Sequence, residues 1–166
     1  MSDKKQAMPG EARTGMTCEM AAPRMQPIPQ GSMTAEQSVA VAEMIAGERG
    51  QLMGSYVPIL RSPALMRKMQ AVGEFFRFEC SLDPRLKEMA SLMVARQWGQ
   101  QYVWEAHTRA GEKCGLDISI MTAIGEGRRP DRMSEDEHVA YDFVSELLVT
   151  RSVSDATYAR AVAALG

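Results

Sequence analysis

Apolar residues recur three and four positions apart along most of the chain beyond residue 33, which is the period of one face of a helix. The first helix is expected over TAEQSVAVAEMIAG, where Thr34 and Gln37 form a capping box and Gly47 ends the helix. A long connection, GERGQLMGSYVPIL, follows it. No segment shows sustained alternation of period two, so the pattern predicts an all-α architecture of packed antiparallel helices.

Two further helices are expected to begin at a proline, which is favoured in the first turn because its missing N–H has no intrahelical partner there. Ser62 and Pro63 open one that should end near Phe78, and Asp83 with Pro84 opens the next, PRLKEMASLMVARQWG. This third helix is apolar almost all round in its middle. It is therefore expected to be the central helix.

The fourth helix, QQYVWEAHTRAGEKCG, resumes the apolar pattern after Gly99 and should close at Gly115. Because the connection to the third helix is short, the two are expected to form a hairpin. The remaining helix starts are predicted from capping residues at Asp117, at the capping box of Ser134 and Glu137, and at Ser154 or Asp155.

Length and composition predict one compact helical domain over residues 33–166, because 166 residues with 45% hydrophobic content can bury an ordinary core. Residues 1–32 are rich in Pro, Gly, Met and charge without any period, and are expected to form a disordered or extended arm. Cys18, Cys80 and Cys114 share no CxxC or CxxH spacing, so neither a disulfide framework nor a cysteine metal site is indicated.

The charge pattern limits the partners that we expect. A formal net charge of −2 without a basic cluster argues against nucleic acid as a partner. No continuous apolar run follows the first lysines and none reaches spanning length, so neither a signal peptide nor a membrane partner is expected. These features predict a soluble protein of the reducing cytoplasm.

Two ionisable residues are expected to meet across the hairpin. Glu88 borders the apolar face of the third helix, and His107 lies in the apolar stripe of the fourth. In one semi-buried crevice they would suit general acid–base chemistry. The alternative is a core histidine satisfied by a backbone carbonyl, with Glu88 as an ion-pair or capping partner at the edge. No third ligand is visible for a metal, so none is expected.

Arg96 and Trp104 are candidates for the surroundings of that crevice. Arg96 lies two turns beyond Glu88, and its guanidinium suits a bidentate contact with a substrate carboxylate, although such an arginine more often makes a surface or intersubunit ion pair. Trp104 suits a pocket wall, although an aromatic residue at helical spacing is more often core packing.

From about Pro23 onward the chain contains AGERG, LRSPALMRKMQAVGEFFRF, SLDPRLKEMASLMVARQWGQQYVWEAH, GEKCGLD and SEDEHVAYDFVSELLVTRSVSDATYARAVAALG. In this order and spacing, these segments resemble the carboxymuconolactone decarboxylase family of the alkylhydroperoxidase D-like superfamily. The superfamily's catalytic pattern is Glu, eleven residues, Cys, two residues, Cys, three residues, His, and Glu88 and His107 hold its two ends. The resemblance implies that superfamily's helical bundle, with a central antiparallel helix hairpin.

The chain departs from this pattern at the two cysteine positions, which hold Gln100 and Val103. A thiol peroxidase of the superfamily needs that pair of thiols near a base, and glutamine and valine cannot replace them. Peroxiredoxin-like antioxidant activity, with Cys80 or Cys114 as the thiol, is therefore the less favoured alternative. Many cysteine-free relatives carry Glu where this chain has Val103, and they usually continue with another apolar helix beyond the position of Gly166.

The resemblance implies a lyase of aromatic catabolism that needs no cofactor. The namesake reaction removes carbon dioxide from a carboxylated muconolactone, and the electron density left on the lactone must be stabilised and then protonated. In such a scheme His107 would deliver the proton, and Glu88 would orient or tune this histidine. The substrate-binding residues would be Arg96, Gln100, Tyr102 and Trp104.

Two further expectations remain open beside the enzymatic one. The resemblance implies a homo-oligomer, a trimer or hexamer, which also suits a helical chain with many apolar faces. A non-enzymatic oligomeric binding protein that shares the fold is a third possible function. It is favoured if His107 is fully buried and satisfied.

Overall fold

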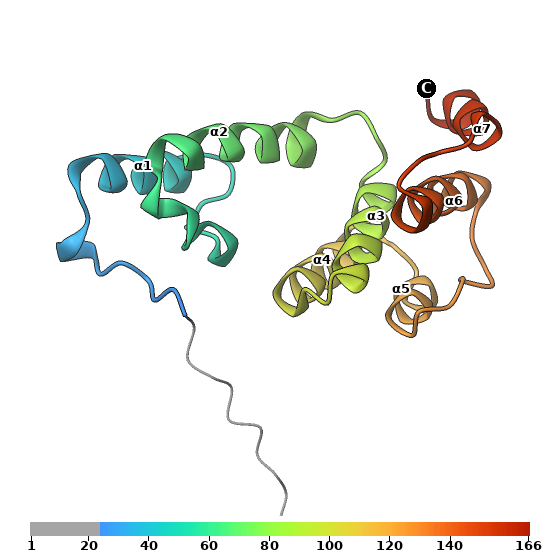
Figure 1. The fold of residues 1–166 in the computed structure, drawn as a ribbon, viewed down its shortest axis with the longest axis horizontal. Helices are drawn as coiled ribbons and strands as arrows, with labels where there is room; N and C mark the ends of the chain where they lie inside the picture. The colour runs from blue at the N-terminus through green and yellow to red at the C-terminus, as the bar shows by residue number, and fades with distance from the viewer. Residues whose placement is uncertain (1–23) are drawn as a thin grey trace, which may run out of the picture. The chain divides into compact units, whose positions relative to one another are not determined.

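The computed structural model describes residues 24–166 and has an all-α fold (Figure 1), as the apolar pattern predicts. Within these residues there is no strand. The α-helices are α1 (Ala35–Ala46), α2 (Pro63–Glu74), α3 (Pro84–Gln97), α4 (Gln101–Cys114), α5 (Ile118–Gly125), α6 (Glu135–Thr150) and α7 (Asp155–Leu165). Short 3₁₀ turns lie at Gln30–Ser32, Gly54–Tyr56 and Ile59–Arg61.

The helix starts follow the local signals in the sequence. Thr34 and Gln37 form the capping box of α1, and the side chain of Asp83 accepts a hydrogen bond from the backbone N–H of Arg85 at the start of α3. The capping box at Ser134, the Asp117 cap of α5 and the Ser154 cap of α7 are also present. Capping satisfies N–H groups that the first turn of a helix cannot pair by itself.

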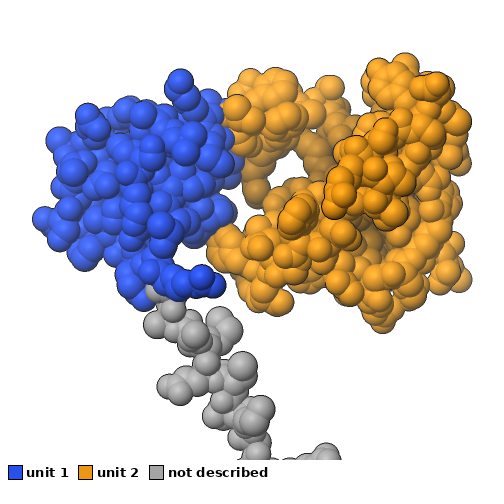
Figure 2. All heavy atoms as spheres, viewed as in Figure 1, with its two compact units in different colours: residues 1–71 blue, residues 72–166 orange. Residues whose placement is uncertain are grey.

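The chain divides into two compact units, residues 1–71 and residues 72–166, which Figure 2 shows in blue and orange. The boundary falls within α2. The predicted arm covers residues 1–32, of which residues 1–23 lie outside the described part of the chain. The prediction of one domain over residues 33–166 stays a prediction.

The core of the first unit is formed by Ala40, Met44, Leu60 and Met66, all fully buried or nearly so. Partly buried Ile28 packs against this core, so the described end of the predicted arm contacts folded structure. The guanidinium of Arg61 also donates a hydrogen bond of 2.9 Å to the carbonyl of Gln26. Burying a leucine or methionine side chain contributes about 1.5–3 kcal/mol.

In the second unit α3 is the central helix, as its apolar pattern predicts. It packs against α4, α5 and α6 and contributes Leu86, Met89, Leu92 and Met93 to the core. Side chains of α5 and α6, among them Ile120, Ile124 and Ala140, complete the core. The helix is therefore enclosed by three neighbours.

Two local features depart from regular helix. The second helix was expected to run to about Phe78, but α2 ends at Glu74 and a π-helical turn, Phe75–Glu79, follows it. In this turn the N–H of Cys80 bonds the carbonyl of Phe75 at 2.8 Å, five residues back. Among residues 24–166, none of the helices combines the length and the hydropathy that a bilayer crossing requires.

Candidate acid–base site

Helices α3 and α4 form the predicted antiparallel hairpin through a very short connection. The N–H of Gln100 bonds the carbonyl of Ala95 at 2.9 Å, and Gly99 takes a left-handed conformation with φ of 61°. A glycine adopts this conformation without the steric cost that a Cβ atom brings. The reversal brings the first half of α3 alongside the second half of α4.

Across this hairpin, Nδ1 of His107 lies 2.6 Å from Oε2 of Glu88. The distance is that of a strong, charge-assisted hydrogen bond. An anionic carboxylate can only accept, so Nδ1 carries the hydrogen, whether the imidazole is neutral or protonated. The residues that the resemblance places at the two ends of the catalytic pattern are thus in direct contact.

Partial burial gives the pair its chemical character. The side chain of Glu88 is 14% exposed and that of His107 is 27% exposed. Within residues 24–166, the imidazole of His107 makes one hydrogen bond, through Nδ1, and Nε2 has no hydrogen-bond partner. The nitrogen on the far side of the imidazole is therefore left for a ligand or for water.

This geometry bears on the alternative of a satisfied core histidine. Such a histidine would be enclosed and would use both ring nitrogens, or would bond a backbone carbonyl. His107 instead keeps more than a quarter of its side chain exposed, although its contact with Glu88 is the ion pair that this alternative also expects. The condition that favours a non-enzymatic binding protein, full burial and satisfaction of His107, is not met.

Arg96 occupies a different position on α3 from Glu88. Its Nε donates a hydrogen bond of 2.8 Å to the carbonyl of Gly125, at the end of α5. Gly127, with φ of 75°, lies beside the guanidinium, and a Cβ built there would be 3.3 Å from Nη2 of Arg96. The arginine is thus held by the backbone of residues 125–127 and makes no surface ion pair among the described residues, while the intersubunit ion pair of that alternative stays a prediction.

Arg96, Gln100 and Trp104 meet along one open cleft of about 350 Å³. We name it the α3–α4 cleft; it is also lined by Ala95, Gly99, Gln101 and Gly125. Trp104 is partly buried against the core of the second unit, and a Cβ at Gly125 would come within 3.1 Å of its ring. The indole of Trp104 therefore both packs against the core and forms part of the cleft wall, so both expectations for this residue apply.

The structure does not bring all the predicted site residues to one place. Glu88 and His107 do not line the α3–α4 cleft, and Arg96 lies eight positions after Glu88, which is about 12 Å along a helix. Tyr102 is half exposed and does not line this cleft either. The acid–base pair and the predicted substrate-binding residues are two neighbouring features of the same hairpin.

Cys80 and Cys114 are free thiols, and Sγ of Cys114 donates to the carbonyl of Gly111 at 3.3 Å. Cys18 lies outside the described residues. Among residues 24–166, no group of three or more His, Cys, Asp or Glu side chains is placed to hold a metal ion.

Sequence reasoning missed a second set of polar residues near α3. Tyr141 and Ser145 on α6, with Gln97 on α3, line another cleft, between these two helices. A weak signal was present, because Tyr141, Ser145 and Leu148 share one face of α6 at spacings of four and three, so a serine interrupts an apolar stripe.

Comparison of the chain with models of known families, with curated proteins and with solved structures finds no match. The resemblance to the carboxymuconolactone decarboxylase family therefore stays a prediction. The geometry of Glu88 and His107 stands independently of it.

Proposed function

We propose that this protein is a carboxymuconolactone decarboxylase-like lyase that acts on a small carboxylated lactone or a related ring compound without a cofactor. The observation that carries the proposal is the 2.6 Å contact between Glu88 and His107, with Nε2 of the imidazole unpaired in the described structure. A positioned histidine oriented by a carboxylate is an arrangement that suits proton transfer to a carbon atom.

In the proposed reaction the bond between the ring carbon and the carboxylate breaks, and carbon dioxide leaves. The electron pair of that bond is delocalised into the lactone carbonyl as an enolate. Nε2–H of the protonated His107 then donates its proton to carbon, and the neutral imidazole regains a proton from water. The carboxylate of Glu88 stabilises the imidazolium before the transfer and keeps hydrogen on Nδ1, so that Nε2 is the nitrogen that exchanges protons.

The substrate would lie over the surface of the α3–α4 hairpin. We propose that Arg96, Gln100, Tyr102 and Trp104 contribute to its binding, with Arg96 as the cation for a carboxylate. Its Nη groups are available because Gly125 binds only Nε. Arg96 lies about 12 Å along α3 from Glu88 and is held at Gly125, so a substrate that contacts both Nε2 of His107 and Arg96 would have to extend along the hairpin.

The test is carbon dioxide release together with loss of ultraviolet absorbance from 4-carboxymuconolactone. Wild type should turn over, and His107→Gln should lose about a hundredfold or more of the rate, the usual contribution of general acid catalysis. His138→Gln is the matched control, because His138 is the other histidine and contacts Arg129 on a different part of the second unit. Full turnover by His107→Gln would remove the proposal, and no turnover by wild type would withdraw the namesake reaction.

We also propose that the chain assembles into a homo-oligomer, a trimer or hexamer. Large apolar side chains such as Trp98, Val149 and Tyr158 are well exposed in the isolated chain, with Trp98 at 71%. Exposed apolar side chains of this size are available for contacts between subunits. Size-exclusion chromatography with light scattering at micromolar concentration should give a trimer or larger assembly, and a monomer alone would contradict this.

A further inference from the structure

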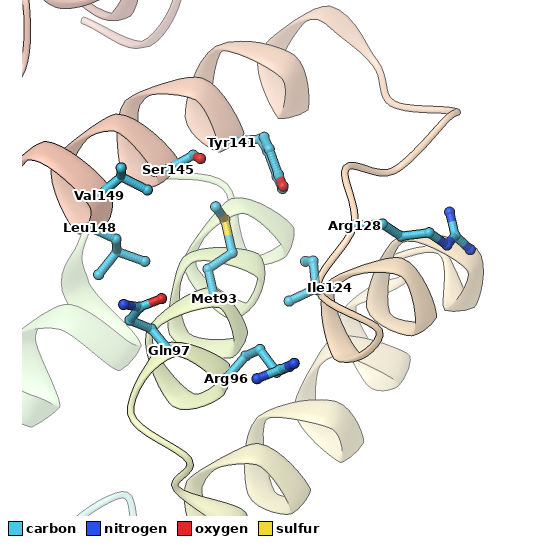
Figure 3. A pocket seen from close by; sticks show the side chains of 10 residues that line it. Met93, Arg96, Gln97, Ile124, Arg128, Tyr141, Ser145, Leu148 and Val149 are labelled. Atoms are coloured by element: carbon cyan, nitrogen blue, oxygen red, sulfur yellow. The ribbon is translucent and has the colours of Figure 1, made fainter.

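A second cleft lies between α3 and α6, and we name it the α3–α6 cleft. It has a volume of about 110 Å³. Apolar side chains form much of its lining: Met93 from α3, Ile124 from α5, and Leu148 and Val149 from α6. Figure 3 shows Met93 in the middle of these side chains, with α6 on one side and the end of α5 on the other.

Three uncharged polar groups line this apolar cleft. They are the amide of Gln97, the hydroxyl of Tyr141 and the hydroxyl of Ser145. Within residues 24–166 none of the three makes a side-chain hydrogen bond, although the ring of Tyr141 stacks under the guanidinium of Arg129. A few unpaired polar groups around an apolar floor are typical of a small-molecule site.

The two arginines of the cleft differ in what already binds them. Arg128 is paired with Glu126 at 2.6 Å and with Asp131 at 3.4 Å, and in Figure 3 its side chain extends away from the other labelled residues. Arg96 has no carboxylate partner among the described residues, and its single hydrogen bond uses Nε. Its two Nη groups therefore make no hydrogen bond to the described residues, and they lie on an exposed side chain at the edge of this cleft.

The backbone fixes Arg96 in that position. Gly125 accepts from Nε, and the left-handed Gly127 leaves the space that the guanidinium occupies, since a Cβ there would be 3.3 Å from Nη2. A guanidinium held through Nε presents its outer edge to a ligand with little further loss of conformational entropy. This is how a preorganised anion contact is made.

We propose that the α3–α6 cleft binds a small monocarboxylate with a compact apolar body. The carboxylate takes the Nη groups of Arg96, and the body lies against Met93, Ile124 and Leu148. An enclosed cavity of about 150 Å³ holds a benzene ring. The α3–α6 cleft is smaller than that, at about 110 Å³, but it opens to solvent, so a single ring or a short branched chain would fill it and extend out of its mouth.

This site is separate from the acid–base pair. Neither Glu88 nor His107 lines it, and the proposal does not rest on the lyase activity. The α3–α4 cleft shares Arg96 with it, so variants of Arg96 alone would not distinguish the two clefts. Ser145 belongs to the α3–α6 cleft and not to the α3–α4 cleft, which makes it the residue that separates them.

The experiment is a titration of the full ¹⁵N-labelled chain with benzoate, followed by the backbone amide signals in NMR spectra, with neutral benzamide as the comparison. Benzoate should shift the amide signals of Gln97, Ser145 and their neighbours. Benzamide should bind at least about tenfold more weakly than benzoate, because it lacks the negative charge. Arg96→Gln should weaken benzoate binding by about tenfold. Arg128→Gln, the matched control, should change it by less than about twofold because that guanidinium is already ion-paired.

Ser145→Val tests the cleft without touching Arg96, because it removes a hydroxyl and fills the space beside the apolar floor. It should weaken benzoate binding while its spectrum stays that of a folded protein, and it should leave any turnover of 4-carboxymuconolactone unchanged. His107→Gln should bind benzoate like wild type, so failure of the lyase proposal and failure of this one are distinguishable. Equal binding of benzamide, an equal loss in Arg128→Gln, or shifts confined to residues away from the α3–α6 cleft would each overturn the proposal.

Discussion

Arg85 and Glu88 lie about one turn apart on α3, and each forms ion pairs with a neighbouring helix. The two clusters differ in whether any hydrogen-bonding group is left without a partner. Arg85 meets Glu137 at 3.0 Å and Asp83 and Asp136 at 3.2 Å. Glu88 meets only His107, on the opposite helix of the hairpin. The first group ties the start of α3 to the start of α6, and the second ties α3 to α4.

The two clusters differ in how many of their polar atoms have hydrogen-bond partners, because both contain charged groups. Glu137 is 5% exposed, pairs with Arg85, and accepts from the backbone N–H of Ser134. The guanidinium of Arg85 is likewise engaged by three carboxylates, which raise its pKa further, the hydrogen bond with Asp83 first among them. The Glu88 pair keeps one ring nitrogen without a partner in the described structure. Closely spaced ionisable residues thus form a structural clamp in one case and a group able to exchange protons in the other.

The largest expected effect is that of Arg85→Met on stability. Removing the guanidinium leaves the buried carboxylate of Glu137 without its cation, which for a fully buried pair costs about 3–5 kcal/mol. Because the side chain of Arg85 is 29% exposed, we expect about 2–3 kcal/mol less free energy of unfolding, measured by urea denaturation. A loss below about 0.5 kcal/mol would show that the cluster is not a clamp.

A smaller effect is expected when the acid–base pair is broken by Glu88→Ala. The change leaves Nδ1 of a half-buried imidazole unpaired, and the free energy of unfolding should fall by about 1 kcal/mol. The tautomer should respond as well, since hydrogen is held on Nδ1 only by the carboxylate. Long-range ¹⁵N NMR spectra of His107 should show Nδ1–H in neutral wild type and a mixture of tautomers in the variant. An unchanged tautomer would contradict the orienting role of Glu88.

Low pH is expected to destabilise the protein through Asp136, at the start of α6. The hydroxyl of Ser134 donates to Asp136 and, with the N–H of Glu137 and the charge of Arg85, lowers the pKa of that carboxyl below its ordinary 3.8 against the opposing effect of burial. The folded state therefore binds fewer protons than the unfolded state near pH 4, so this stability is present above pH 3.8 and is lost as pH falls through the folded pKa. The melting temperature should fall between pH 5 and pH 3, and Asp136→Asn should flatten that fall. Parallel curves for both proteins would contradict the prediction.

The smallest effect is expected at an ion pair that is neither clamp nor catalyst. Arg109 and Glu105 lie one turn apart on the outside of α4, 3.3 Å from each other, and both side chains are more than half exposed. Arg109→Met should change the free energy of unfolding by about 0.3 kcal/mol and should leave turnover unchanged. A larger loss of stability would mean that the exposed fraction of an ion pair does not predict its contribution to the free energy of unfolding in this unit.

The helices could be predicted because their signals are local. Thr34 with Gln37 and Ser134 with Glu137 are capping boxes, and Gly115, with φ of 83°, ends α4 where a left-handed residue is needed. Each signal lies within about four residues of the group that it satisfies. The contact of Glu88 with His107 was also within reach of the sequence, because a short connection at Gly99 leaves two helices little choice but to lie antiparallel.

The remaining parts of the site depend on contacts between residues far apart in the chain. The carbonyl that binds Arg96 belongs to Gly125, 29 residues on, and the groups that complete the α3–α6 cleft come from Tyr141 and Ser145. The residue spacing within one helix gives the face on which a side chain lies but not the neighbour that it meets. For the same reason, the extra residue per turn after Glu74 could not be expected from the apolar pattern, which continues through Phe75 and Phe76.

Most of these contacts share α3. Between Arg85 and Gln97 this helix carries the clamp, the carboxylate of the acid–base pair, the floor of one cleft and the arginine common to both clefts. Natural variation on α3 would therefore alter several properties at once and would be removed by selection more often. Tyr141 and Ser145 on α6 line only one of the two clefts, so changes on that helix can alter the α3–α6 cleft while the contact between Glu88 and His107 stays in place.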